Sequence, residues 1–235
     1  MPRPTPSPFA RALRQALAGA ADPARAPAMQ AYMKSEMAFL GVGSPERRAL
    51  VRAALGARPI RDPESWQRAV LDLWPRARFR EERYAAVDVL LHPRHRHFLT
   101  LERLPLLEKL ITEGAWWDYV DALASHGLGS LLCAQPAKTR RVLRRWSRSS
   151  SLWKRRAALL AQLKLREKAD LELLYACIEV NLEEDDFFIQ KAIGWALRQH
   201  AWTDPKEVRR YVARFGSRLS PLARREALKN IGKRT

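Results

Sequence analysis

The sequence has few of the residues that mark secreted or membrane-spanning proteins. Only two of its 235 residues are cysteine, Cys133 and Cys177, and neither stands in a CxxC pair. Both lie among apolar residues, so we expect two reduced core thiols in a cytoplasmic protein. No run of about 18 apolar residues occurs, so no transmembrane helix is expected. The first residues, MPRPTPSPFARAL, contain four prolines and no apolar run, which does not fit a signal peptide.

Signals for β-strands and for several enzyme classes are also missing. There is no Asn-Gly or Asp-Gly hairpin, and no P-loop, GxSxG or HExxH motif, so nucleotide hydrolysis, serine-hydrolase chemistry and zincin chemistry have no support. The histidines of LLHPRHRHFL (His92, His95 and His97) are separated by arginines, which would repel a divalent cation. We therefore predict no metal and no cofactor, and a solvated basic loop near nucleic acid at this position.

Positive charge is what the chain has in excess. Lys and Arg number 43 against 25 Asp and Glu, which gives a net charge of +18. An excess of this kind attracts polyanions, so nucleic acid is the leading partner and an anionic membrane surface is the second. Hydrophobic residues make up 47% of the chain, a share that indicates a folded protein rather than a disordered one.

Helix-start signals recur along the chain. A residue able to cap a helix precedes a proline at Ser44, Asp62, Asp204 and Ser220. The cap oxygen accepts a backbone N–H that has no helical partner, and proline is tolerated next because it lacks that hydrogen. About a dozen helices, paired at a spacing near 40 residues, predict an all-α, HEAT-like repeat solenoid of paired antiparallel helices. We expect one domain over residues 1–235, with 1–7 as a flexible extension; a globular helical bundle is the alternative.

The segment SSSLWKRRAALLAQLKLREK, residues 149–168, predicts a single helix. Its leucines gather on one stripe, and Arg156 projects into the middle of that stripe. An unpaired guanidinium is costly to bury, so Arg156 needs either a structural ion-pair partner or an anion at the edge of the packed face. Lys154 and Arg155 are expected to be ordinary solvated charges, while Lys164 borders the stripe and is a candidate to follow a phosphate backbone.

The segment FFIQKAIGWALRQH, residues 187–200, places an indole between two cations. Lys191, Trp195 and Arg198 share one helix face at positions i, i+4 and i+7. Such a face suits stacking on a sugar or base while the cations pair with phosphates. Burial of Trp195 in the core is the alternative. Gly194 beside it leaves room for a close backbone or ligand approach.

The segment GAWWDYVDAL, residues 114–123, combines two tryptophans with two aspartates. Helical periodicity assigns Trp116 to the core and Asp118 to solvent, and makes Trp117 and Asp121 neighbours at the border of the apolar face. Asp121 is unusual in so basic a protein, because nucleic acid repels a lone acid. From spacing alone two interpretations stay open, a catalytic carboxylate and a structural ion pair with a nearby arginine.

These segments also carry a family resemblance. AYMK around Tyr32, FLGVGSPERR, WWDYVD, LWKRRAALLAQLK, FFIQKAIGWALR and SPLARREALK are similar to segments of the bacterial DNA alkylation repair glycosylases of the AlkD type. The resemblance spans nearly the whole chain. It implies a HEAT-like solenoid whose concave basic face holds double-stranded DNA. It also implies excision of cationic N3- or N7-alkylated purines without the base flipping that most glycosylases use.

The resemblance further implies roles for particular residues. Trp117, Asp121 and Trp195 match the catalytic cleft, Tyr32 matches an aromatic residue beside it, and Arg156 and Lys164 match residues that contact the DNA backbone. One departure is Gly43, where relatives can carry a longer polar side chain before the hydroxyl. Together with the cations beside Trp195, the candidate DNA contacts are Arg156, Lys164, Tyr32, Lys191, Arg198, Ser44 and Arg48.

The chemistry expected of this set is hydrolysis of an N-glycosidic bond. An N3- or N7-alkylpurine is already cationic and leaves without protonation, while positive charge develops on the deoxyribose. Asp121 would stabilise that charge and orient water, and Trp117 and Trp195 would embrace the sugar. No amine is placed for a Schiff base, so we expect a monofunctional enzyme, a monomer, that leaves an abasic site. The alternatives are a non-catalytic binder of DNA structure and a protein-interaction scaffold.

Overall fold

The protein is all-helical. The computed structural model describes residues 5–231, which form fourteen α-helices, short 3₁₀ segments, one π-helical segment and a single isolated β-bridge between Ala38 and Phe79. The chain divides into two compact units, Met1–Leu99 (unit 1) and Thr100–Thr235 (unit 2). The predicted all-α, HEAT-like fold class is confirmed.

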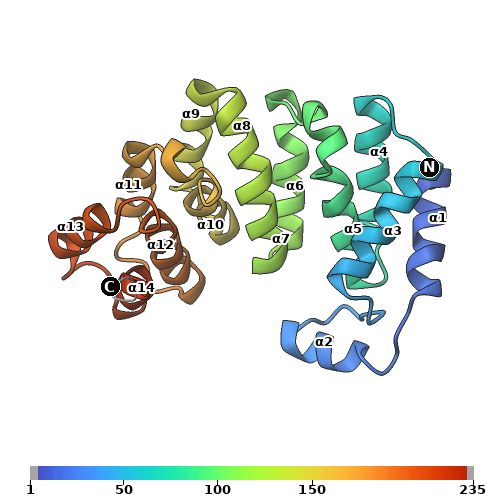
Figure 1. Cartoon of the computed structure of the whole chain (residues 1–235), viewed down its shortest axis with the longest axis horizontal. Coiled ribbons are helices and arrows are strands. Elements are labelled where there is room, and N and C mark those ends of the chain that lie inside the picture. The colour runs from blue at the N-terminus through green and yellow to red at the C-terminus, as the bar shows by residue number, and fades with distance from the viewer. Residues whose placement is uncertain (1–4, 232–235) are drawn as a thin grey trace. The chain divides into compact units, whose positions relative to one another are not determined.

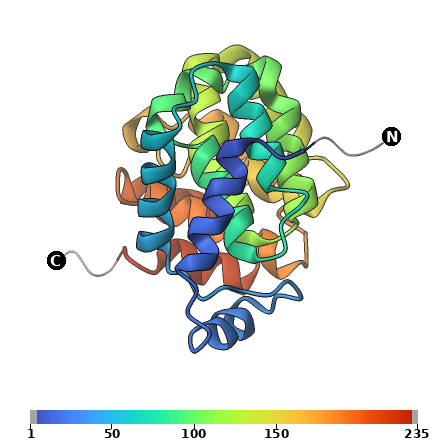
Figure 2. The same ribbon diagram turned by 90° about the vertical axis from the view of Figure 1, so that its right-hand side faces the viewer.

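Unit 1 is a group of four packed helices with a fifth beside them. The helices are α1 (Pro8–Gly19), α2 (Ala26–Met33), α3 (Ser44–Ala57), α4 (Pro63–Leu73) and α5 (Arg80–Leu90), followed by the 3₁₀ helix η1 (Pro93–Phe98). Helix α1 packs on α3, α4 and α5, and α3 and α4 each pack on α5. Helix α2 lies at one end of this unit (Figures 1 and 2).

A buried carboxylate fixes the loop that leads into α3. Glu81 on α5 is fully buried and accepts backbone N–H groups from Leu40 at 2.9 Å, Gly41 at 2.9 Å and Val42 at 3.2 Å. Gly41 has φ +87, and a Cβ there would lie 2.0 Å from the carbonyl oxygen of Asp22. Glycine is therefore required at this turn, which sets where α3 begins.

Unit 2 consists of paired helices. They are α6 (Leu104–Gly114), α7 (Trp117–Ala122), the π-helical η3 (Leu123–Leu128), α8 (Gly129–Ala134), α9 (Pro136–Trp146), α10 (Leu152–Leu160), α11 (Leu171–Glu179), α12 (Phe187–His200), α13 (Pro205–Phe215) and α14 (Pro221–Leu228), with 3₁₀ segments η2 (Leu101–Arg103) and η4 (Arg166–Lys168).

The helices of unit 2 alternate between two rows. Helices α7, α10, α12 and α14 contact one another in succession, and we call them the α7 row. The alternating helices pack on that row: α6 on α7, α9 on α10, and α13 on α14. Figure 1 shows α10, α12 and α14 on one side of this unit and α9, α11 and α13 on the other. This two-row stacking is typical of HEAT-like repeats.

Three of the four predicted helix caps are present. Asp62 accepts the N–H of Ser65 at 2.7 Å, Asp204 that of Glu207 at 2.9 Å, and Ser220 that of Ala223 at 3.1 Å. The prediction for Ser44 was wrong, because α3 already includes it and Gly43 is the N-cap residue. The hydroxyl of Ser44 instead accepts a hydrogen bond from Arg47 at 3.3 Å.

One predicted helix boundary was also wrong. The helix expected over 149–168 ends at Leu160, although a serine, Ser151, does cap its start. The side-chain amide of Gln162 exchanges two hydrogen bonds with the backbone of Asp170, at 3.0 and 2.6 Å, and so stabilises a chain reversal there. Ser7, the last residue of the extension predicted at 1–7, caps α1 and donates its N–H to Asp72 at 2.7 Å. Residues 1–4 of the predicted extension lie outside the described residues.

The thiols and histidines deviate from expectation in two places. Cys177 is buried as predicted, whereas Cys133 is exposed on α8. The expected basic loop is a 3₁₀ helix, and His95 is buried in it, stacked 5.7 Å from the ring of Phe98.

Within residues 5–231 no three His, Cys, Asp or Glu side chains gather as metal ligands. No helix in that same range is long and apolar enough to cross a membrane.

Candidate functional site

The centre of the site is an ion pair between two helices of the α7 row. Asp121 on α7 and Arg156 on α10 meet through two parallel hydrogen bonds, from Nε of Arg156 to Oδ1 and from Nη2 to Oδ2, both 2.8 Å. The third guanidinium nitrogen, Nη1, donates to the carbonyl oxygen of Phe188 on α12 at 2.5 Å. Arg156 thus joins three helices, and only 3% of it is exposed.

The carboxylate of Asp121 lies in a low-dielectric environment. Burial raises its pKa above the ordinary value of 3.8, and the hydrogen bonds and charge of Arg156 oppose that shift. Since both oxygens accept N–H groups from a guanidinium, the geometry is that of an ionised carboxylate. The sequence reasoning left an ion pair and a catalytic group as alternatives; the structure contains the ion pair, with part of the carboxylate still accessible.

The backbone around Asp121 departs from regular α-helix. Immediately after α7 the chain forms the π-helical segment η3, and the Ser125 hydroxyl donates to the carbonyl oxygen of Asp121 at 2.7 Å. Such insertions in helices are frequent at functional sites. Here the hydroxyl satisfies a carbonyl next to the site and helps to fix the position of Asp121.

Phe188, which lies beside the ion pair, packs against two further aromatic rings. Phe188 stands 5.5 Å from Trp116 and 5.1 Å from Trp153, centroid to centroid, and its ring also lies 5.9 Å from the guanidinium carbon of Arg156. Trp116 was expected in the core, yet it is the N-cap residue of α7 and only half-buried. Tyr119, on the next turn, is buried. Trp117, the first residue of α7, is partly exposed, as its predicted border position requires.

The second group of candidates lies on α12. Trp195 is half-buried, and the cations on either side of it, Lys191 and Arg198, both pair with Glu226 of α14. The Lys191 ammonium lies 2.7 Å from Oε1 of Glu226, and Arg198 binds Oε2. Glu226 is only 5% exposed, and the hydrogen bond from Lys191, with the charges of both cations, lowers its pKa. One acid therefore fixes both cations beside the indole.

Gly194 allows Glu226 to come close to Lys191 and Arg198. A Cβ at Gly194 would lie 2.6 Å from Cβ of Glu226 and 2.7 Å from the carbonyl oxygen of Ala223. The close approach predicted at Gly194 is thus that of α14, and it brings Glu226 under the two cations.

Two cations that sequence reasoning assigned to solvent are in fact paired. Lys154 forms an ion pair with Glu108, and Arg155 with Glu184 at 2.6 Å. Both side chains are largely covered, because α10 packs between its neighbours and its polar positions face them. Lys164 differs from them: it lies in the turn after α10 and is exposed.

The remaining candidates belong to unit 1. Tyr32 on α2 is 78% exposed. Arg48 is largely exposed, with its Nε 3.7 Å from Asp88, while its neighbour Arg47 is buried and binds the same carboxylate at 2.7 Å. Ser44 stands in the first turn of α3. The contacts of Tyr32, Ser44 and Arg48 with DNA remain predictions.

Sequence reasoning missed two residues of the site, Phe188 and Glu226. Phe188 contributes a carbonyl group, which no side-chain pattern reveals. Glu226 sits in SPLARREALK, where it is the single acid among three cations. Gly194, with helical neighbours on both sides, was the available signal that another helix comes close.

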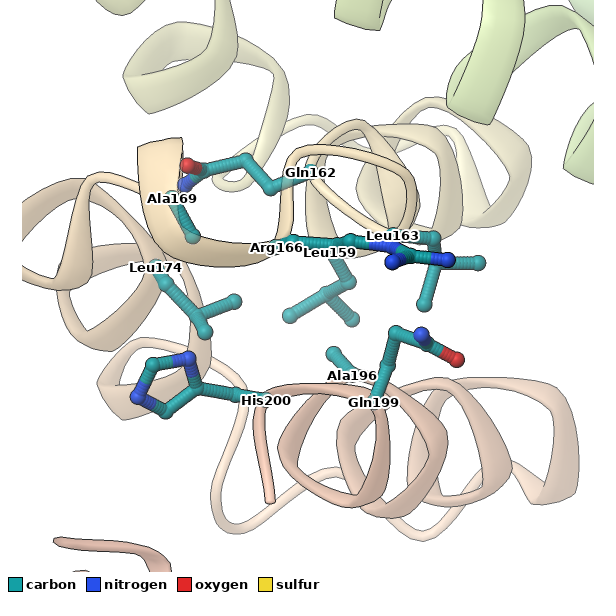
Figure 3. A pocket seen from close by; sticks show the side chains of 9 residues that line it. All are labelled: Leu159, Gln162, Leu163, Arg166, Ala169, Leu174, Ala196, Gln199 and His200. Carbon is teal, nitrogen blue, oxygen red and sulfur yellow. The ribbon is translucent and has the colours of Figure 1, made fainter. Parts of the chain in front are cut away.

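A separate pocket lies between α10, α11 and α12. It is narrow, and the residues that line it include Leu159, Leu174, Ala196 and His200. Figure 3 shows His200 and Leu174 at one end of it and Gln199 at the other. Neither ring nitrogen of His200 has a hydrogen-bond partner among residues 5–231, and burial lowers its pKa.

Comparison with known proteins gives a consistent result. A family model described as DNA alkylation repair enzyme matches residues 13–231, a range that includes every candidate residue above. A solved structure described as a predicted DNA alkylation repair enzyme from Enterococcus faecalis is similar at 33% sequence identity and a TM-score of 0.80. The similarity covers 89% of this chain and 95% of that one. The comparison with curated proteins found no match.

Proposed function

The chain belongs to the DNA alkylation repair enzyme family, and on this premise we propose that it is a monofunctional DNA glycosylase of the AlkD type. The proposed reaction is hydrolysis of the N-glycosidic bond of cationic N3- and N7-alkylated purines in double-stranded DNA. It proceeds without base flipping and leaves an abasic site. The proposal includes a monomer that works on nucleoid DNA in the bacterial cytoplasm and binds the duplex on a concave basic face.

The observation that carries this proposal is the Asp121–Arg156 pair. A carboxylate held by two hydrogen bonds keeps its position as the reaction proceeds, so it stabilises developing charge with little reorganisation. The alkylated purine takes the bonding electron pair as it leaves, and positive charge appears on the deoxyribose. The accessible part of Asp121 faces that charge and accepts a proton from the attacking water. Water oxygen then bonds to the anomeric carbon.

Arg156 has a second role in this account. Five N–H groups are available on a guanidinium, and three of them bind Asp121 and Phe188. The remaining donors can meet a DNA phosphate, which would otherwise repel the carboxylate. The arginine thereby allows an acid to work next to a polyanion.

The two partly exposed indoles supply the other contribution. Trp117 lies one helical turn from Asp121, and Trp195 is flanked by Lys191 and Arg198. Indole faces attract cations by about 0.5–2 kcal/mol, so they favour a sugar that gains positive charge. We assign Trp117, Asp121 and Trp195 to catalysis. The residues assigned to DNA contact are Arg156, Lys164, Lys191, Arg198, Tyr32, Ser44 and Arg48.

Product analysis tests the proposed reaction. Methylated duplex DNA incubated with the protein should release free N7-methylguanine and N3-methyladenine. The strand should break only after alkali, at abasic sites, and borohydride should trap no covalent adduct. A trapped adduct would replace the monofunctional mechanism with a Schiff base.

A non-catalytic binder of DNA structure is the second candidate, because a buried Asp–Arg pair is also a common structural device. The same assay separates the two. Tight binding of methylated duplex with no released base would refute the glycosylase and support the binder.

A further inference from the structure

A basic hollow, separate from the pocket beside His200, opens where α12, α13 and the end of the described chain meet. Its lining includes Arg198, Trp202, Lys206 and Arg209. Trp202 is 50% exposed, an unusual state for so large an apolar side chain. As far as the structure describes the chain, the lining contains three cations and no acidic side chain. The hollow therefore suits an anion that also presents a flat or apolar surface.

Trp202 continues the face of α12 that carries the candidate site. Lys191, Trp195, Arg198 and Trp202 follow at i, i+4, i+7 and i+11, which is one stripe at 100° per residue. The helical path persists past the end of α12, since Ala201 has φ −60 and ψ −18 and donates its N–H to Leu197 at 2.9 Å. Arg198 lines the hollow and also borders Trp195, so the hollow is continuous with the surface around Trp195.

The spacing along this stripe can be compared with a DNA strand. Seven residues separate Trp195 from Trp202, about 10.5 Å at 1.5 Å per residue. Successive nucleotides of one strand rise about 3.4 Å, so this distance corresponds to about three nucleotides. A strand that passes Trp195 and runs along α12 reaches the hollow about three nucleotides away.

We propose that the hollow lined by Trp202, Lys206 and Arg209 is a DNA-backbone subsite that holds a deoxyribose and phosphate about three nucleotides from the excision site. Lys206 is exposed and makes no ion pair with residues 5–231, so its charge is available to a phosphate. Arg209 donates one hydrogen bond to the carbonyl of Ile231 at 3.2 Å and keeps further donors. The indole of Trp202 packs on the sugar.

This subsite rests on the proposed binding of duplex DNA, and binding alone can test it. The probe is a duplex with a tetrahydrofuran abasic analogue at its centre, which needs no catalysis. Lys206→Ala should make the slope of log affinity against log salt shallower by about 0.9, the value of one neutralised phosphate. Trp202→Ala should weaken binding at least fivefold, about 1 kcal/mol. Lys138→Ala, an exposed charge on α9 that does not line the hollow, is the matched control and should change neither quantity.

Shortening the duplex locates the subsite. On one side of the analogue, cutting the strand from about four to about two nucleotides should weaken wild-type binding. The Trp202→Ala/Lys206→Ala variant should lose no affinity on the same cut. If wild type and variant lose affinity equally on both sides, the subsite is refuted while DNA binding stands. If wild type binds no duplex at all, the proposed function itself fails.

Discussion

At the scale of single residues, the site depends on how two charges are held. Asp121 is buried enough to raise its pKa, yet it stays ionised because Arg156 faces both of its oxygens. Sequence spacing placed Asp121 next to Trp117 and placed Arg156 in an apolar stripe. Spacing did not predict the contact between Asp121 and Arg156, because these residues lie on different helices, α7 and α10. A pattern within one helix does not show which other helix it contacts.

The raised pKa of Asp121 predicts the acid limb of excision. Base release needs the carboxylate, so the rate falls as pH falls through the pKa of Asp121. Because burial raises that pKa, the fall should begin above the ordinary value of 3.8. The measurement is the single-turnover release rate against pH, corrected for spontaneous depurination. Asp118→Asn should keep this limb, moved slightly to lower pH because the charge of Asp118 also raises the pKa of Asp121, and Asp121→Asn should lack it. A limb at or below 3.8 in the wild type would contradict the account.

The imidazole of His200, which has no hydrogen-bond partner among residues 5–231, predicts a separate effect of pH, on stability. Burial lowers its pKa below 6.5, although Asp204 and Glu207 oppose the shift. The unfolded chain then binds the proton more tightly, so stability is complete above about pH 6.5 and is lost as pH falls toward the lower, folded pKa. His200→Leu should therefore gain stability relative to wild type between about pH 8 and about pH 5. Urea unfolding at several pH values measures this, and a difference independent of pH would contradict it.

At the scale of helices, the contact between α12 and α14 sets the geometry around Trp195. On α12 the buried stripe consists of Ile189, Ala192, Ile193 and Ala196. The sequence could not identify α14 as the neighbour of α12, since Glu226 lies 28 positions from Arg198 along the chain. Helix starts capped by a nearby side chain, such as those at Asp62 and Asp204, were predictable from the sequence. The early end of α10 was not, because it depends on a hydrogen bond between Gln162 and Asp170.

Gly194→Ala tests this helix contact. The added methyl would meet backbone and Cβ atoms of α14 at 2.6–2.7 Å, which cannot move cheaply, so we expect a loss of about 1–3 kcal/mol in unfolding free energy. DNA binding should weaken as well, since Glu226 moves with α14. The control is Gly56→Ala in α3, where a Cβ meets nothing within 4 Å and a small gain of about 0.4–1 kcal/mol is expected. Equal stability of both variants would refute the contact.

At the scale of the whole molecule, the 43 Lys and Arg residues behind the net charge of +18 serve two purposes. Some cations are bound by acids within the fold, such as Arg156 by Asp121 and Arg155 by Glu184. Others, such as Lys164 and Lys206, are exposed. Composition predicted the polyanionic partner, and the helix signals predicted the all-α class. Neither separates the paired cations from the exposed ones, because each pairing depends on tertiary contacts.

The exposed cations predict a strong dependence of DNA binding on salt. Log affinity for unmodified duplex should fall linearly with log salt, with a slope of about −0.9 for each phosphate neutralised. Fluorescence anisotropy over a range of salt concentrations gives the slope. Lys164→Ala should make it shallower by about one phosphate. A slope near zero in the wild type would point to a protein partner instead.

The most direct test of the central claim is the single-turnover rate of N7-methylguanine release by wild type, Asp121→Asn and Asp118→Asn. Both variants must first bind the abasic-analogue duplex and melt cooperatively, which shows that they are folded. Loss of a positioned carboxylate should slow Asp121→Asn by about 100-fold or more, whereas Asp118→Asn, on the same helix, should stay close to wild type. A folded Asp121→Asn that releases the base at the wild-type rate would contradict the assignment of Asp121 to catalysis.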